Sequence, residues 1–312
     1  MRLDDLDKSS NIEDRRGESG GGGGFGLPIG GGGLGIGTIV VLGLIGWALG
    51  IDPRVLIGGA EILSGGGNSQ YQQPAQPGGQ ARRTGSPSDA AGSFVASVLG
   101  STEAQWKAIF AEGGKTYRPP ILVMYNGQTR AEGCGLAQSA MGPFYCPGDK
   151  KVYLDTSFFR EIENRFHGCQ GKACQFSQAY VIGHEVGHHV QNLLDVLPNV
   201  QRRQQQMSKV EANRLQVRVE LQADCLAGVW ANRQNQQLKR EGKPPFIEPG
   251  DVEAAMQTAS AIGDDALQRQ ATGRVMPDSF THGSSAQRQR WFMTGLKDGG
   301  IAACNTFQSD NI

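Results

Sequence analysis

The sequence predicts an α+β domain, mainly helical with a small antiparallel sheet, preceded by a single transmembrane helix and a flexible tether. Most segments after residue 93 repeat apolar residues at helical spacing, whereas short β-rich runs lie between residues 121 and 155. The chain has 312 residues with 46 glycines and 14 prolines, and most of the glycine excess precedes residue 93. The part expected to fold is therefore about 220 residues, enough to bury one sizeable core.

An uncharged stretch at 30–51 has the length of a transmembrane helix. At a rise of 1.5 Å per residue it would span about 33 Å, close to the roughly 30 Å hydrocarbon core of a bilayer. Four basic residues precede the stretch and only Arg54 closely follows it, which predicts a cytoplasmic N-terminus. The expected location is the inner (cytoplasmic) membrane, crossed once, with the domain in the periplasm. The alternatives are a cleaved signal peptide, for which the polar lead is long, and a glycine-rich linker that does not insert.

Composition divides the chain into four parts. Residues 1–29 form a polar, glycine-rich tail, 30–51 the anchor, 52–92 a flexible linker and 93–312 the domain. The linker is rich in Gly, Gln, Pro and Ser, so it cannot offset the entropy lost on ordering. The formal net charge is zero, which argues against a nucleic-acid partner. Nothing in the sequence indicates an oligomeric state.

The domain is expected to contain five helices and two β segments. The apolar spacing predicts helices at 94–111, 158–166, 175–194, 199–238 and 284–296. A strand is expected at 121–125, and a hairpin runs from 143–146 through Pro147-Gly148-Asp149 to 151–155.

Six cysteines follow the tether, at Cys134, Cys146, Cys169, Cys174, Cys225 and Cys304. An even count confined to a part expected to be exported predicts disulfides. Proximity favours pairing Cys134 with Cys146 and Cys169 with Cys174, which leaves Cys225 for Cys304. The competing interpretation is a cysteine-rich zinc site, but no CxxC pair occurs and the spacings are irregular.

The segment His184-Glu185-Val186-Gly187-His188 carries the strongest chemical signal. Residues four apart on a helix differ by about 40° of rotation, so both imidazoles project from one face and can share a Zn²⁺. Glu185 is rotated by about 100° and can reach a metal-bound water as a general base. A chance match is less favoured, because the segment follows an apolar run in an expected helix. His189 is rotated by about 140° from His184 and is expected to pack elsewhere.

A catalytic zinc site needs a third protein ligand. The downstream candidates are Asp195, Glu211, Glu220, Asp224 and His282. Glu220 and Asp224 share a helix face among apolar neighbours, which favours Glu220 as the ligand. Asp224 would then accept the free N–H of a ligand histidine. The alternative is that both acids lie on a solvated face.

The motifs HEVGHH and ELQADCLAG resemble those of gluzincin metallopeptidases with an HExxH…ExxAD pattern. The charged start, glycine-rich anchor, tether and GHEVGHHVQ core together resemble the bacterial putative neutral zinc metallopeptidase family over essentially the full length. The resemblance implies a zincin-like domain, one Zn²⁺ per chain and peptide hydrolysis. It assigns His184, His188 and Glu220 as ligands, Glu185 as the base and Asp224 as the acid behind a ligand.

A later segment, Thr281-His282-Gly283-Ser284-Ser285-Ala286-Gln287-Arg288, resembles the THPxxxxR stretch of CAAX-type relatives, in which the His and Arg lie near the substrate cleft. Gly283 stands where those relatives have proline, which leaves the shape of the loop open. His282 could stabilise the oxyanion, occupy an open zinc position, or be a capping or surface histidine. Arg288 is expected to pair with a carboxylate.

The expected function is zinc-dependent hydrolysis of peptide bonds in exported proteins or peptides by a membrane-tethered endopeptidase. The strand at 151–155 is expected to bind extended substrate by edge pairing, and Tyr153 is an alternative to His282 at the oxyanion. Two other interpretations stay open. One is a catalytically silent zinc-binding envelope scaffold, against which the intact Glu185 argues. The other is a structural module in which HEVGH is coincidence.

Overall fold

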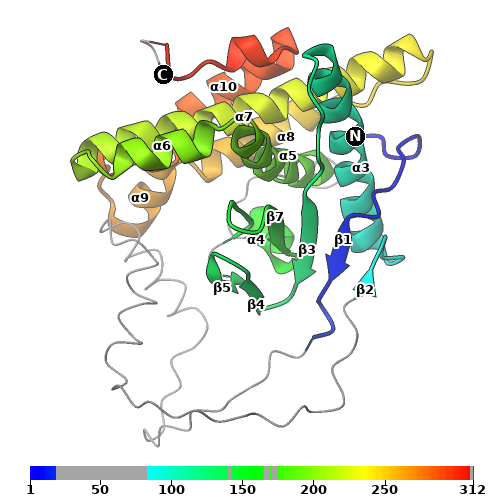
Figure 1. Ribbon diagram of the computed structural model, residues 1–312, viewed down its shortest axis with the longest axis horizontal. Coiled ribbons are helices and arrows are strands. Elements are labelled where there is room, and N and C mark those ends of the chain that lie inside the picture. The colour runs from blue at the N-terminus through cyan, green and yellow to red at the C-terminus, as the bar shows by residue number, and fades with distance from the viewer. Residues whose placement is uncertain (19–82, 140–141, 165–168, 170–173, 310–311) are drawn as a thin grey trace, which may run out of the picture.

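The computed structural model describes residues 1–18, 83–139, 142–164, 169, 174–309 and 312. A five-stranded sheet lies beside a larger group of helices (Figure 1). The prediction of a mainly helical α+β protein is therefore confirmed.

The sheet is mixed, which corrects the prediction of an antiparallel sheet. Its spatial order is β2-β1-β3-β7-β6, where the strands are Arg83–Thr84, Ile12–Asp14, Ile121–Tyr125, Lys151–Asp155 and Phe144–Cys146. Strand β3 is parallel to both β1 and β7, and the outer pairs are antiparallel. Between β3 and β7 the chain forms a separate two-stranded sheet, β4 (Gln128–Ala131) with β5 (Gly135–Gln138). The connection between β3 and β7, the two most apolar strands, therefore brings the chain back so that these strands run parallel.

Strand β7 lies inside the sheet, so the prediction that 151–155 binds substrate through a free edge is wrong. It pairs with β3 on one side and β6 on the other. The hairpin of β6 and β7 is present as predicted. Tyr153 of β7 is fully buried and donates to Asp149 Oδ2 at 2.6 Å. Its hydroxyl is thus engaged within the hairpin, which removes it as a candidate for the oxyanion.

Residues 1–18, expected to be a tail separate from the domain, are part of the folded unit. Strand β1 pairs with β3, placing Ile12 opposite Leu122. The charge of Glu13, next to Ile12, is balanced by Arg15 at 2.6 Å and by Lys151 of β7 at 2.7 Å. One apolar residue among charges gives little strand signal in the sequence.

The predicted anchor at 30–51 lies outside the described residues, as does the linker up to residue 82. No helix within the described ranges is long and apolar enough to cross a membrane. The last residues assigned to the linker are structured. They form β2 and the start of helix α3, for which Asp89 is the N-cap.

The main helices are α3 (Ala90–Glu112), α4 (Ser157–Asn164), α5 (Cys174–Leu193), α6 (Val196–Gln204), α7 (Lys209–Arg240), α8 (Asp251–Ala261), α9 (Asp264–Thr272) and α10 (Ser285–Asp298). Short 3-10 turns occur at Pro277–Ser279 (η3) and Ile301–Cys304 (η4). Four predicted helices are found close to their expected bounds, but the one predicted at 199–238 is two. Ser208 and Glu211 form a capping box that starts α7 as a new helix. Helices α8 and α9 were not predicted from the sequence.

Small residues bring α7 into close contact with α5 and α10. A Cβ on Gly187 of α5 would lie 3.0 Å from the carbonyl oxygen of Ala223 on α7. A Cβ on Gly295 of α10 would lie 1.9 Å from the carbonyl oxygen of Cys225. Helix α7 is therefore held between its two neighbours, as Figure 1 shows. Trp230, Phe176 and Phe292 fill the core at these contacts and are fully buried.

The six cysteines form three disulfides, Cys134–Cys146, Cys169–Cys174 and Cys225–Cys304. The first two are the pairs that proximity in the sequence favoured, and the third is the pair that these two left over. The last one closes the longest loop, 79 residues in sequence, and fixes η4 to α7. Closing a long loop restricts the unfolded chain most and so stabilises the fold.

Candidate metal centre

Side chains from α5 and α7 converge at one point. The two Nε2 atoms of His184 and His188 are 3.1 Å apart. Glu220 Oε2 lies 3.2 Å from Nε2 of His184 and 3.4 Å from Nε2 of His188. Tetrahedral bonds of 2.0–2.1 Å place ligand atoms about 3.3–3.4 Å apart. The three atoms therefore have the spacing that a Zn²⁺ between them requires, and two imidazoles with one carboxylate are a typical zinc donor set.

A buried carboxylate orients the first histidine. Asp224 is 0% exposed, and its Oδ1 lies 2.8 Å from His184 Nδ1. Burial raises the pKa of Asp224, but the charges of Arg288 and His184 outweigh burial and lower the pKa to about 2. An ionised carboxylate only accepts, so His184 donates from Nδ1 and directs Nε2 toward His188 and Glu220.

The site favours positive charge at the point of convergence. Burial lowers the pKa of His184, but the carboxylates of Asp224 and Glu220 raise it by more, so that the resulting pKa is about 10. Burial has the opposite effect on Glu220 and raises its pKa. The neighbouring imidazoles of His188, His282 and His184 outweigh burial and hold that pKa well below its ordinary value. In the metal-free protein a proton on His184 therefore lies where a cation would bind, and metal binding must displace it.

Of the five candidates for the third ligand, all in described ranges, Glu220 is the one that groups with the two histidines. Its other carboxylate oxygen, Oε1, accepts from Gln216 Nε2 at 2.8 Å. Glu211 is exposed and belongs to the capping box of α7. Asp195 is also exposed, at the start of α6.

Asp224 is the centre of a buried polar network. Arg288 donates from Nε to Oδ2 at 2.9 Å and from Nη2 to Oδ1 at 3.0 Å. The Tyr180 hydroxyl donates to Oδ1 at 2.6 Å. The expectation that Arg288 pairs with a carboxylate is thus confirmed. Asp224 lies directly behind His184, as the shared helix face with Glu220 predicted.

Tyr180 and Gln216 were not predicted, although helical spacing contains the signal. Tyr180 precedes His184 by four residues and Gln216 precedes Glu220 by four, so each lies on the same helix face as its partner. Two rows of polar residues therefore face each other across the contact between α5 and α7.

Glu185 lies beside the cluster without being one of its three members. It is 7% exposed. Burial raises the pKa of its carboxyl, and the nearby imidazoles of His184 and His188 oppose that shift. Its role as the general base stays a prediction.

A loop positions His282 near the same cluster. Asp264 Oδ2 accepts the backbone N–H groups of Thr281, His282 and Gly283 at 2.7, 2.7 and 3.0 Å. Asp264 Oδ1 lies 3.4 Å from His282 Nδ1. A charge on His282 opposes the rise in the pKa of Glu185 and contributes to the lowered pKa of Glu220, so its ring interacts electrostatically with the cluster.

Gly283, which stands in place of the proline of the THPxxxxR pattern, has a backbone conformation that proline cannot adopt. Its φ is +97°, whereas proline is fixed near about −65°. A Cβ there would also lie 3.1 Å from Leu221 Cδ2. The absence of a side chain at Gly283 therefore allows the loop to pack closely against Leu221 of α7.

His189 packs away from the cluster, as expected. Its Nε2 donates to the carbonyl oxygen of Arg118 at 2.7 Å, and its Nδ1 lies 3.1 Å from the Tyr145 hydroxyl. Burial lowers its pKa to about 4, so the ring is neutral and structural.

The fold and these three side chains define a class of protein. In this class an HExxH helix provides two histidines of the candidate metal site, and a second helix provides the glutamate that completes it. The chain belongs to the family described as putative neutral zinc metallopeptidase, whose profile matches residues 1–307. It is 45% identical over 312 residues to the uncharacterized protein YpfJ of Escherichia coli K12, covering 98% of this chain and 99% of the relative. It is 41% identical over 221 residues to the uncharacterized protein Rv2575 of Mycobacterium tuberculosis H37Rv, covering 70% and 71%. No solved structure matches.

Proposed function

We propose that this protein is a zinc-dependent endopeptidase that hydrolyses peptide bonds in exported proteins or peptides. The observation that carries the proposal is the convergence of His184, His188 and Glu220 at zinc-ligand spacing, with Glu185 alongside. The family to which the chain belongs supports the same reaction class.

The roles of the side chains follow from their positions. A bound Zn²⁺ supplies Lewis acidity and makes a water molecule acidic near neutral pH. Glu185 takes a proton from the attacking water and delivers it to the leaving amine, as a positioned general base does. His282 donates a hydrogen bond to the oxygen that becomes negative when the peptide carbonyl is attacked.

We further propose that the folded unit works outside the cytoplasm. Three disulfides involve all six cysteines, and such bonds persist in oxidising compartments. Attachment to the inner membrane through residues 30–51 stays a prediction.

Removing the metal is expected to abolish cleavage of an unfolded protein such as casein, and adding Zn²⁺ should restore it. The purified protein should contain one zinc per chain by elemental analysis. Stoichiometric zinc without cleavage would favour the silent scaffold. Absence of zinc binding would contradict the proposal altogether.

His282→Ala is expected to lower kcat by about 10²–10³, the usual effect of losing one oxyanion donor, with unchanged zinc content. Asp264→Asn should lower kcat less, because Asp264 acts by holding His282 and its loop. In the His282→Ala background, Asp264→Asn should then add almost nothing. Kinetics of the two single variants and the double variant check this. Fully additive losses would show that Asp264 acts independently of His282.

A further inference from the structure

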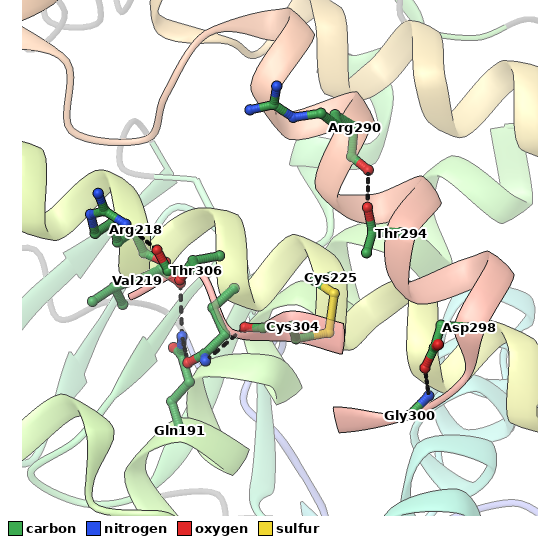
Figure 2. The surroundings of a disulfide bond; sticks show 11 residues. Gln191, Arg218, Val219, Cys225, Arg290, Thr294, Asp298, Gly300, Cys304 and Thr306 are labelled. Atoms are coloured by element: carbon green, nitrogen blue, oxygen red, sulfur yellow. Dashed lines mark hydrogen bonds between the residues drawn. A yellow bond between two sulfur atoms is a disulfide. The ribbon is translucent and has the colours of Figure 1, made fainter. Parts of the chain in front are cut away.

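Gln191 links the second histidine to the helix that carries Glu220. It lies on α5, is 0% exposed, and follows His188 by three residues. Its Oε1 is 2.8 Å from His188 Nδ1. Its Nε2 donates to the carbonyl oxygen of Val219 at 2.8 Å (Figure 2). The same Nε2 donates to Gln222 Oε1 at 3.0 Å.

These partners determine which way the amide of Gln191 faces. The Val219 carbonyl can only accept, so Gln191 must direct its Nε2 toward it. Oε1 then faces His188, whose Nδ1 must donate. The remaining ring nitrogen, Nε2, keeps its lone pair on the side of His184 and Glu220, 3.4 Å from Glu220 Oε2.

The amide of Gln191 is itself supported. Gln222 accepts from Gln191 and donates from its Nε2 to the carbonyl oxygen of Cys304 at 3.0 Å. Cys304 is fixed to α7 by its disulfide with Cys225 (Figure 2). A second contact, from Thr306 Oγ1 to the Arg218 carbonyl at 2.6 Å, holds the same segment on α7. The side-chain amides of Gln191 and Gln222 thus form a chain of hydrogen bonds that ends at the carbonyl oxygen of Cys304, a residue held in place by a disulfide.

The two partners of Gln191 on α7 lie on either side of Glu220 in the sequence. One side chain thus sets the ring orientation of His188 and ties that ring to the turn that presents Glu220. Asp224 orients His184 in the corresponding way, but as a carboxylate.

We propose that Gln191 is a positioning residue, which holds His188 in the tautomer that binds metal and fixes its distance from Glu220. Gln222 and the Cys304 carbonyl support it. This inference rests on the proposed function only in that the cluster binds Zn²⁺.

The test measures zinc affinity by chelator competition, the visible absorption of the Co²⁺-loaded protein and the melting temperature of the apo-protein. Gln191→Leu should weaken zinc binding about 10–100-fold, the usual effect of losing a partner of a metal ligand, and should alter the Co²⁺ spectrum. Gln191→Glu keeps an acceptor for His188 but loses both donors. It should therefore hold zinc within a few-fold of wild type while its apo-protein melts lower.

Gln234→Leu is the matched control. Gln234 is a glutamine on α7 with 2% exposure, bonded to Ser101 and Gln105 away from the cluster. Its replacement should lower the melting temperature without changing zinc affinity.

The inference is overturned if Gln191→Leu binds zinc like wild type, or if Gln234→Leu weakens binding equally. Should Gln191→Leu fail to fold, Gln191→Glu decides. Retained affinity with lower stability supports positioning, and a parallel loss of both overturns it. If the wild type itself binds no zinc, the proposed function fails as well, so the two failures are distinguishable.

Discussion

Replacing Glu185 with glutamine is expected to lower kcat for casein cleavage by about 10²–10⁴, the usual contribution of a general base. An amide of the same size cannot take the proton of the attacking water. Glu185 is not a member of the cluster formed by His184, His188 and Glu220, so zinc content should stay at the wild-type level. Steady-state kinetics and elemental analysis of the same preparation measure both quantities.

Glu211→Gln is the control for this substitution. Glu211 is an exposed carboxylate in the first turn of α7, and its loss should leave kcat unchanged. Cleavage by Glu185→Gln at the wild-type rate would contradict the mechanism. Loss of zinc together with activity would instead make Glu185 a ligand.

The largest effect on stability is expected for Arg288→Met. Arg288 is 4% exposed and pairs with a fully buried Asp224. Removing Arg288 takes away one of the two positive groups that face the buried Asp224 carboxylate and leaves only His184. Losing one partner of a buried ion pair costs about 3–5 kcal/mol. Urea unfolding of the metal-free protein at neutral pH measures the loss.

The pH dependence of stability follows from the same pair. The folded protein lowers the pKa of Asp224 from 3.8 to about 2. A lowered carboxyl pKa stabilises the fold above the ordinary value, and this contribution is lost as the pH falls from about 4 toward 2. In Arg288→Met this part of the acid dependence should shrink.

Arg214→Met provides the comparison. Arg214 pairs with Asp278 at 3.0 Å, but both side chains are more than two-thirds exposed (68% and 69%). Such pairs contribute about 0–1 kcal/mol. If Arg288→Met cost no more than Arg214→Met, the buried pair would not hold the structure behind His184.

The residues that form the candidate metal site could be grouped from the sequence, because spacing on a helix is a local property. His184, Glu185 and His188 follow from one helical turn, and Glu220 and Asp224 from another. Gln191 and Gln216 were not predicted, since an isolated glutamine on a helix resembles a surface residue. Their roles depend on the neighbouring helix, and the contact between α5 and α7 is set by packing at Gly187 and Ala223.

The sheet was harder to predict for a related reason. The strand at 121–125 and the hairpin that ends at 155 were recognised from local composition. Their parallel alignment was not, because it depends on where β4 and β5 lead the chain. Strand β1 has a single apolar residue, and its charges are neutralised only by partners such as Lys151, far away in the sequence.

Strand β1 also bears on the compartment in which each part of the chain resides. Ile12–Asp14 lies between β2 and β3, and strands of one sheet lie on the same side of any membrane. Residues 1–18 therefore belong to the same folded unit as the domain, and the membrane topology of the chain stays a prediction. Arg16, counted among the basic residues that predicted a cytoplasmic start, instead binds Asp14 and Asp89 at 2.6 Å.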